Sequence, residues 1–206
     1  MSINNNQQYF NNTKFIKSVF KLQDLPMDNA KELAIVGRSN CGKSSVINSI
    51  TNKKKLAVTS KTPGRTRAIN YFEIEPEKYL VDLPGYGYAK VAVATKLAWG
   101  SLIEQYLQTR KSLIGIILIM DIRHPFKPED EQMLLFCKHN HLKTNIILNK
   151  ADQLSSNKAK ATQQSSIITL QSLDITADVQ IFSSINGIGI IELREKIIDW
   201  FHVEHF

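Results

Sequence analysis

The sequence predicts an α/β fold with a mostly parallel, six-stranded sheet, one antiparallel edge strand, and helices on both faces. Short apolar runs alternate with stretches of helical spacing, which is typical of a parallel sheet covered by helices. The 206 residues, 43% of them hydrophobic, suffice to bury one core without disulfides. We expect residues 1–28 to form a partly ordered N-terminal extension and residues 29–206 to form a single domain.

The first predicted strand, residues 33–36, is an apolar run that ends at a glycine-rich turn. A helix is expected over residues 43–51, and the polar residues 52–67 then form a long loop. Two further strands are expected at residues 69–74 and 79–82, on either side of a turn. The first half of the domain therefore supplies three strands.

The second half begins with a helix over residues 96–110, whose apolar residues recur at helical spacing. Residues 113–120 are uninterrupted apolar positions, which indicates a strand buried on both faces. The next helix is expected to begin at Pro128, since proline is favoured at the first helical position. Acidic residues fill the following turn, where the helix dipole favours them. A strand at residues 144–148 and a polar-faced helix at residues 155–172 follow.

The last two elements are a strand at residues 179–182 and a C-terminal helix. Ile190, Leu193, Ile197 and Phe201 recur at helical spacing and form one apolar stripe along that helix. The stripe is expected to pack against the sheet.

Positive charge is concentrated in one segment. The formal net charge is +7, and residues 31–67 alone carry nine basic side chains against one acid. A nucleotide or RNA is the natural partner of such a segment, and a solvated basic loop is the alternative. The longest apolar run is too short for a membrane helix, and two cysteines make no disulfide framework. We expect a cytoplasmic protein without a membrane partner.

The turn after the first strand matches the phosphate-binding motif G-x-x-x-x-G-K-[ST] at every fixed position. Its glycines let backbone N–H groups approach phosphates, and the helix N-terminus adds positive partial charge. Lys43 would contact the β- and γ-phosphates, and the Ser44 hydroxyl would coordinate Mg²⁺. The candidate phosphate-loop residues are Gly37, Arg38, Ser39, Asn40, Cys41, Gly42, Lys43, Ser44 and Ser45.

A second motif, D-x-x-G, closes the strand at residues 79–82 with Asp82, Leu83, Pro84 and Gly85. An acid at the end of a strand is where proteins with this phosphate loop hold Mg²⁺, usually through water. The Gly85 N–H can meet a γ-phosphate, which only the triphosphate carries. This motif therefore predicts a sensor of the bound nucleotide.

The polar loop at residues 52–67 is expected to supply a threonine that completes the Mg²⁺ shell when the γ-phosphate is present. Thr66 is favoured, because it follows Gly64 and Arg65 just ahead of a strand, and Thr62 is the alternative.

A third motif, Asn149, Lys150, Ala151 and Asp152, follows the strand at residues 144–148. The Asp152 carboxylate can accept hydrogen bonds from N1–H and N2–H of guanine. Adenine lacks this donor pair, so the motif selects GTP over ATP. The Asn149 amide and the Lys150 stem are expected to brace the loop and the base.

Phe182, Ser183 and Ser184 end the last strand, where backbone N–H groups would meet guanine O6. Paired serines are also typical of the approach to a helix. Together, the ordered motifs predict a three-layer P-loop NTPase, with GTP as substrate and GDP as product.

With these motifs the chain resembles the EngB/YsxC family of bacterial ribosome-biogenesis GTP-binding proteins. The resemblance spans about residues 15–201, and residues 37–40, 60–66, 82–89 and 120–125 carry it. It implies a single Ras-like G domain that binds GTP and GDP with Mg²⁺. It also implies a role in assembling the large ribosomal subunit, with rRNA and ribosomal proteins as partners and effects on cell division and septation.

Two positions depart from the usual pattern of that family. Cys41 stands where alanine is common, and Asn149 stands where threonine is common. Both residues are compatible with nucleotide binding. A reactive Cys41 thiol near the phosphates would let alkylation block GTP, and the alternative is a small side chain that fills a turn.

Tyr86 occupies the position of the water-orienting Gln of Ras-type GTPases, and a phenol cannot play the role of that amide. Tyr88 and His124 are candidate substitutes that fit a structural role better. Slow intrinsic hydrolysis is therefore expected, with K⁺ held near Asn40 as an additional source of positive charge. The catalytic candidates are Lys43, Thr66, Gly85 and Asn40.

Three functions compete at this point. The leading hypothesis is a monomeric, GTP-driven switch that binds a pre-ribosomal particle. A standalone NTPase lacks support, since no second catalytic constellation accompanies the motifs. A GTPase that signals to a protein effector is the main alternative, although no lipidation motif at either end favours it.

Overall fold

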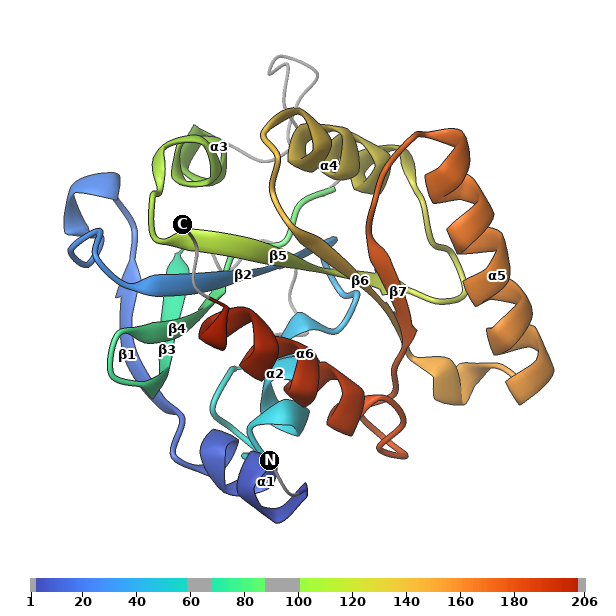
Figure 1. Ribbon diagram of the computed structural model, residues 1–206, viewed down its shortest axis with the longest axis horizontal. Helices are drawn as coiled ribbons and strands as arrows, with labels where there is room; N and C mark the ends of the chain where they lie inside the picture. The colour runs from blue at the N-terminus through green and yellow to red at the C-terminus, as the bar shows by residue number, and fades with distance from the viewer. Residues whose placement is uncertain (1–2, 59–67, 88–100, 204–206) are drawn as a thin grey trace.

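The computed structural model describes residues 3–58, 68–87 and 101–203, which form a sheet with helices on both faces (Figure 1). The strands of this sheet are β1 (Lys14–Val19), β2 (Lys31–Gly37), β3 (Ile69–Glu75), β4 (Lys78–Asp82), β5 (Leu113–Asp121), β6 (Thr144–Asn149) and β7 (Asp178–Ile181). The helices are α1 (Ile3–Asn11), α2 (Lys43–Ile50), α3 (Ser101–Thr109), α4 (Pro128–His139), α5 (Ser156–Ser172) and α6 (Ile190–His202). Two single 3₁₀ turns are η1 (Leu22–Asp24) and η2 (Ala151–Gln153).

The strand order in the sheet is β1-β3-β4-β2-β5-β6-β7. Strands β4, β2, β5, β6 and β7 run parallel, whereas β3 is antiparallel to both of its neighbours. Only Pro76 and Glu77 join β3 to β4, and Glu77 adopts a left-handed φ of 63°. Such a short turn can connect only antiparallel strands, since a parallel pair needs a long crossover.

The α/β class and the mostly parallel sheet are confirmed, but two details of the predicted sheet are wrong. The sheet has seven strands rather than six, because residues 14–19 of the N-terminal segment add β1 along β3. The antiparallel strand β3 consequently lies inside the sheet and not at its edge. Of the residues of β1 only Val19 is buried, so this strand has almost no alternating apolar pattern by which sequence reasoning could find it.

Each face of the sheet has its own hydrophobic cluster. Helices α3, α4 and α5 cover one face, and α1, α2 and α6 cover the other (Figure 1). The first cluster includes Ile103, Tyr106, Met133, Leu134 and Leu170, and the second includes Phe10, Ile47, Ile50, Leu193 and Phe201. The N-terminal helix α1 is thus part of the packed structure through Phe10, whose side chain is fully buried.

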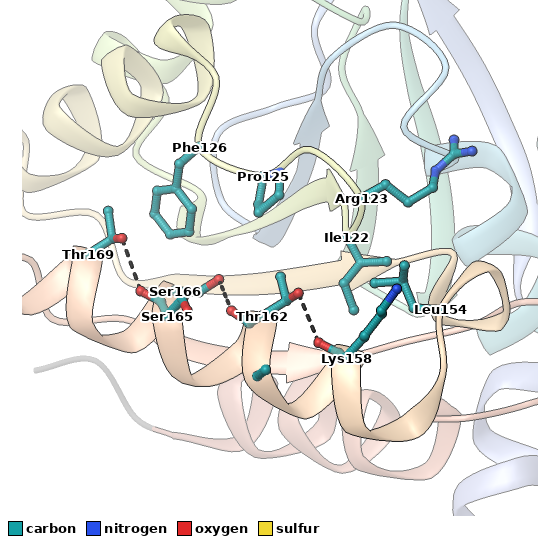
Figure 2. A pocket seen from close by; sticks show the side chains of 11 residues that line it. Ile122, Arg123, Pro125, Phe126, Leu154, Lys158, Thr162, Ser165, Ser166 and Thr169 are labelled. Atoms are coloured by element: carbon teal, nitrogen blue, oxygen red, sulfur yellow. Dashed lines mark hydrogen bonds between the residues drawn. The ribbon is translucent and has the colours of Figure 1, made fainter.

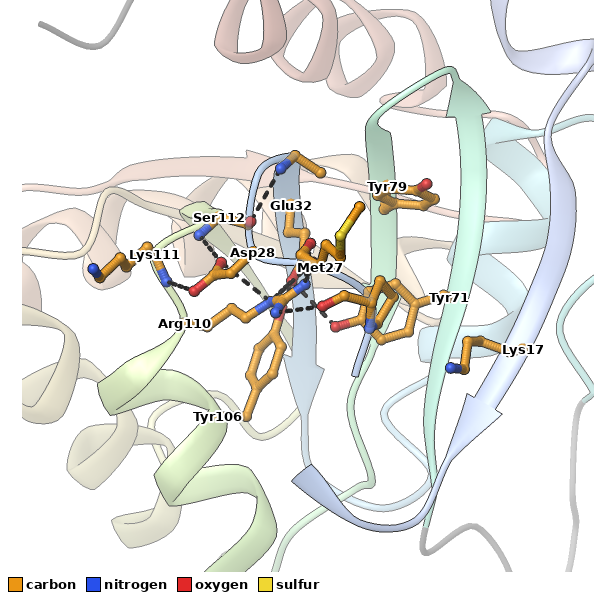
Figure 3. Close-up of polar contacts among 12 residues, drawn as sticks. Lys17, Met27, Asp28, Glu32, Tyr71, Tyr79, Tyr106, Arg110, Lys111 and Ser112 are labelled. Atoms are coloured by element: carbon orange, nitrogen blue, oxygen red, sulfur yellow. Dashed lines mark hydrogen bonds and ion pairs between the residues drawn. The ribbon is translucent and has the colours of Figure 1, made fainter. Parts of the chain in front are cut away.

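A buried carboxylate fastens the start of β2 to α3 and β3 (Figure 3). Glu32 is fully buried and accepts hydrogen bonds from Arg110 Nε at 3.0 Å, Tyr106 Oη at 2.8 Å and Tyr71 Oη at 3.3 Å. Arg110 also donates to the carbonyl oxygen of Pro26 at 2.9 Å, which holds the chain ahead of β2. A buried charge persists only when it is paired in this way, so the network fixes the strand that leads to the phosphate loop.

The parallel strands end at a common edge, and the three predicted motifs lie there. In register, Ile35 of β2 pairs with Asp82 of β4, and Asp121 of β5 pairs with Asn149 of β6. Loops at the carboxyl ends of parallel strands are the usual position of ligand sites in open α/β sheets. The fold thereby brings the motifs together from distant parts of the chain.

Candidate guanine-nucleotide site

The phosphate loop connects β2 directly to α2, as the motif requires. Gly42 has a left-handed φ of 102° and immediately precedes α2. A Cβ at this position would collide with the side-chain amide of Asn149. Glycine at position 42 therefore serves two needs, the backbone conformation and the close approach of the third motif.

Asp82 lies at the end of β4, close to the phosphate-loop lysine. Its carboxylate is 6% exposed, and Oδ1 lies 4.0 Å from Nζ of Lys43. Burial raises the pKa of Asp82, and the positive charge of Lys43 offsets part of that effect. Oδ1 has no hydrogen-bond partner among the described residues.

This orphaned buried oxygen fits a cation that arrives with the nucleotide. Carboxylate and hydroxyl oxygens are the ligands that Mg²⁺ prefers, so Asp82 and the Ser44 hydroxyl are a suitable donor set. The described part of the chain has no group of three or more His, Cys, Asp or Glu side chains that could hold a metal without other ligands. A shared site with phosphate oxygens is therefore the arrangement that the residues support.

Asn70 of β3 is a site residue that the sequence analysis missed. It pairs with Asp82 in the β3–β4 ladder, and its side chain hydrogen-bonds to the Asp82 carboxylate. Asn70 Oδ1 in turn accepts a hydrogen bond from Ser18 of β1 at 2.7 Å. No motif marks Asn70, and only the register of two adjacent strands places it beside the acid.

The D-x-x-G segment lies directly on the phosphate loop. A Cβ at Gly85 would lie 3.1 Å from the backbone of Ser39, so a larger residue would push the two segments apart. The backbone N–H of Ser39 donates to the Tyr86 carbonyl at 2.9 Å, and Arg38 and Tyr86 form a parallel β-bridge. Leu83 extends the contact, because its N–H donates to the Ile35 carbonyl at 3.1 Å.

Tyr86 points away from the nucleotide edge and into the protein. Its side chain is 3% exposed, and its hydroxyl donates to Oδ1 of Asp130 on α4 at 3.1 Å. Asp130 Oδ2 accepts the backbone N–H of Lys127 at 3.2 Å, and burial raises the pKa of this carboxyl to about 6. The residue at the position of the catalytic Gln is thus an anchor between the D-x-x-G segment and α4.

The third motif reaches back to the phosphate loop through two of its residues. Asn149 donates its side-chain amide to the Cys41 carbonyl at 2.9 Å. Lys150, which adopts a left-handed φ of 67°, donates to the Asn40 carbonyl at 2.7 Å. The bracing role predicted for Asn149 and Lys150 therefore takes the form of contacts with the phosphate-loop backbone.

Two neighbouring side chains hold the Asp152 carboxylate in place. Its Oδ1 accepts a hydrogen bond from the Ser183 hydroxyl at 2.6 Å, and Oδ2 accepts one from Gln153 at 2.5 Å. These bonds lower the pKa of Asp152 below its usual value, so the carboxylate stays ionised. Sequence reasoning assigned Ser183 a backbone role, but its N–H donates to the Ile188 carbonyl, and its hydroxyl orients Asp152.

Asp121 is a second residue that the motif search missed. It accepts hydrogen bonds from Lys150 Nζ at 2.9 Å and from Arg123 Nη2 at 2.7 Å. Burial opposes its ionisation, but these two cations lower the pKa of Asp121 well below its usual value. Asp121 lies within residues 120–125, which carry the family resemblance, but no role was predicted for it.

The remaining predicted residues divide into two groups. The first group lies at the same edge and consists of Ser45 on α2, Pro84 after β4, Ala151 and Ser184. The N–H of Ala151 donates to the Phe182 carbonyl at 3.0 Å. The buried hydroxyl of Ser184 has no hydrogen-bond partner among the described residues. The second group lies outside the described residues: Thr62, Gly64, Arg65, Thr66 and Tyr88. His124, the other candidate substitute for the catalytic Gln, is exposed in the loop after β5.

A cavity of about 510 Å³ lies beside the third motif, between α5 and the loop after β5 (Figure 2). Phe126, Pro125 and Ile122 line one side, and Thr162 and Ser166 of α5 line the other. The Thr162 and Ser166 hydroxyls are bonded to the backbone of their own helix. No residue of the three motifs lines this cavity.

The site is that of a P-loop guanine-nucleotide-binding protein: a phosphate loop, a buried acid beside its lysine, and an ionised carboxylate in the third motif. A family model described as 50S ribosome-binding GTPase matches residues 32–150, more than half of the chain. A probable GTP-binding protein EngB of Haemophilus ducreyi is 46% identical over 195 residues, which cover 93% of this chain and 91% of that protein. The chain therefore belongs to the EngB family of GTP-binding proteins.

Solved structures show the same fold. A crystal structure of a probable GTP-binding protein engB aligns with a TM-score of 0.62 at 19% identity, over 82% of this chain and 98% of that one. Era in complex with MgGDPNP and nucleotides 1506–1542 of 16S ribosomal RNA aligns with a TM-score of 0.63 at 22% identity, over 86% of this chain and 58% of that one.

Membership of this family makes the chain a GTP hydrolase, with GTP as substrate and GDP as product. Dependence on Mg²⁺ is usual for GTPases with this phosphate loop. Among the described residues, no helix has both the length and the apolar character needed to cross a membrane.

Proposed function

We propose that this GTPase is a nucleotide-dependent switch that acts in the cytoplasm on the large ribosomal subunit during its assembly, and that normal cell division and septation depend on it. The observation that carries the proposal is the continuity of the nucleotide site with the most basic part of the chain. Residues 31–67 hold nine basic side chains and one acid, and the phosphate loop and α2 lie within them. A ribosomal particle offers the polyanion that such a segment fits.

The similar proteins support this partner. The matching family model is described as a ribosome-binding GTPase, and Era was solved with a segment of ribosomal RNA. Both point to an RNA-containing particle rather than to a protein effector alone.

The proposed roles in the nucleotide site are supported by the contacts among the described residues and by the motifs. Lys43 and the loop backbone would bind the phosphates, and Asp152 would accept from guanine. Ser44 and Asp82 would hold Mg²⁺, which when bound neutralises negative charge on the phosphate oxygens. Thr66 is proposed to join that shell, and Gly85 is proposed to meet the γ-phosphate.

Intrinsic hydrolysis is proposed to be slow, because the buried Tyr86 hydroxyl is bonded to Asp130 and does not face the nucleotide edge. Asn40 has an exposed side chain in a left-handed backbone conformation, which leaves its amide available for K⁺. Equal turnover in KCl and NaCl would argue against that ion.

The experiment that tests the partner is a binding titration of the fluorescently labelled protein, loaded with a non-hydrolysable GTP analogue, against purified large and small subunits. Preferential binding to the large subunit supports the proposal. Equal binding to both subunits would instead indicate nonspecific attraction to RNA. No binding to either subunit would favour the protein-effector alternative.

A further inference from the structure

Two aromatic side chains project from the edge strand of the sheet. Phe15 of β1 is 49% exposed, and Phe20, just beyond β1, is 65% exposed. Phe15 pairs with Phe72 across β1 and β3, and its ring meets that of Phe72 edge-on at 5.9 Å. Val19 pairs with Ile69, which places Phe20 next to the start of β3. Single exposed apolar side chains are common on protein surfaces, so these rings become informative only together with the charged groups around them.

Lysines lie along β1 and beside both of its ends. Residues 14–21 carry three lysines and no acid, and residues 52–58, after α2, also carry three lysines and no acid. The second segment reaches the residue just ahead of β1, because Nζ of Lys53 donates to the backbone carbonyl of Thr13. The loop after α2 therefore lies beside the start of β1, and Figure 1 shows α1 and α2 on that side of the sheet.

Several of these lysines are already engaged. Lys14 pairs with Glu73 at 2.8 Å, and Lys17, labelled in Figure 3, donates to the carbonyl of Asp24 at 2.5 Å. Lys21, Lys54 and Lys55 are exposed, and no described acid forms an ion pair with any of them. These three ammonium groups are free to meet an external anion.

We propose that Phe15, Phe20, Lys21, Lys54 and Lys55 form one surface, here called the β1 surface, that binds unpaired nucleotides of RNA. The inference rests on the proposed function and names the part of an RNA-containing partner that this face would recognise. Exposed aromatic rings provide stacking faces for bases, and lysines contact the backbone phosphates. Paired bases are already stacked, so the surface favours single-stranded over duplex RNA.

The polar groups between the rings favour RNA over a lipid surface. By register, Ser18 and its partner Asn70 lie between the positions of Phe15 and Phe20 and bond to each other at 2.7 Å. Ile16, at the irregularity after Phe15, is 40% exposed and adds apolar surface. The Ser18–Asn70 pair still divides the two rings with polar groups, which suit the edges of bases better than a lipid surface.

The test measures binding of a fluorescein-labelled oligouridine and of a matched RNA duplex across a salt series. Phe20→Leu keeps an apolar side chain but removes the stacking face, and it should weaken oligouridine binding about tenfold without changing the salt slope. Phe20→Trp should retain binding. Lys54→Ala should lower both the affinity and the slope, by roughly 0.7 for one phosphate contact on a single strand.

Ile168→Ala is the matched control, because Ile168 is 57% exposed on α5, away from β1, and its loss should change nothing. Oligouridine binding that is unaffected by Phe20→Leu, equal affinity for the duplex, or failure of the wild type to bind oligouridine would overturn the inference. Binding of phosphatidylserine vesicles that Phe20→Leu abolishes would also overturn it, in favour of a membrane.

The same variants separate this inference from the proposed function. If the protein binds large subunits in the GTP state and Phe20→Leu binds them equally well, the β1 surface is wrong and the switch stands. If no variant binds large subunits while oligouridine binding still depends on Phe20, the ribosomal switch is wrong and the β1 surface stands.

Discussion

Asn149 donates its side-chain amide to the backbone carbonyl of Cys41 at 2.9 Å, and the two residues are 108 positions apart in the chain. The bond is buried and joins the guanine motif to the phosphate loop. Recognition of the base and of the phosphates is thereby placed on one connected backbone. A nucleotide that contacts both ends meets a site whose two halves are already held in register.

Asn149→Ala should weaken GDP and GTP alike by about tenfold, because the Cys41 carbonyl would be left buried without its donor. Isothermal titration gives both affinities. Asn145→Ala on the same strand is the control, since the buried Asn145 amide has no partner among the described residues and lies away from the loop. Equal affinities in wild type and Asn149→Ala would show that the bond does not shape the site.

Asp152→Asn should reduce GTP affinity by at least about 100-fold, because the amide offers a donor where guanine N2–H also donates. Xanthosine triphosphate has a carbonyl oxygen at that position, so its affinity should rise in the variant. Competition against a fluorescent GDP analogue measures both. Gln153→Ala, which removes only a hydrogen bond to Asp152, should keep guanine preference. A position-152 variant that still discriminates GTP from ATP fully would contradict the assignment.

The nucleotide-free protein should lose stability as the pH rises from 5 to 8 because of Asp130. Burial raises its folded-state pKa to about 6 from an ordinary 3.8, so the protonated form is favoured on folding. The protonated carboxyl stabilises the folded state fully at pH values below the pKa of the unfolded chain. That contribution is lost as the pH rises through the folded-state pKa of about 6. The expected loss between pH 5 and 8 is on the order of 1 kcal/mol.

Denaturant unfolding at both pH values measures this difference. Asp130→Asn can still accept the Lys127 N–H and donate to the Tyr86 oxygen, so the variant should fold. Its pH dependence over this range should be smaller by the same amount. An identical pH profile in wild type and variant would show that Asp130 does not titrate there.

Native Cys41 should resist alkylation. The thiol is 4% exposed, and burial raises its pKa to about 11, so little thiolate exists near neutral pH. Cys137 is similarly buried, with a pKa of about 12. Mass spectrometry after iodoacetamide treatment should find both residues labelled only in denaturant. Rapid native labelling at Cys41 with loss of GTP binding, absent in Cys41→Ala, would restore the hypothesis of a reactive thiol.

Sequence reasoning worked where a motif is contiguous and its neighbours are strongly apolar. The turn at residues 37–44 is flanked by a buried strand and a helix, so both its type and its place follow from local pattern. It failed at β1, whose side chains are mostly exposed, and at Asn70, which reaches Asp82 only through strand register. Ser183 was predicted from its place after the last strand, but the bond from its hydroxyl to Asp152 depends on how two loops meet in space.

The central claim is tested most directly by co-sedimentation with purified large ribosomal subunits, with GDP or a non-hydrolysable GTP analogue, over a salt series. The account predicts binding that requires the GTP analogue and weakens as salt rises, because the basic residues near the phosphate loop contribute. Lys43→Ala, which should lose the nucleotide, is predicted not to pellet with the subunits. Absence of binding in either nucleotide state, or binding that ignores the nucleotide, would contradict the account.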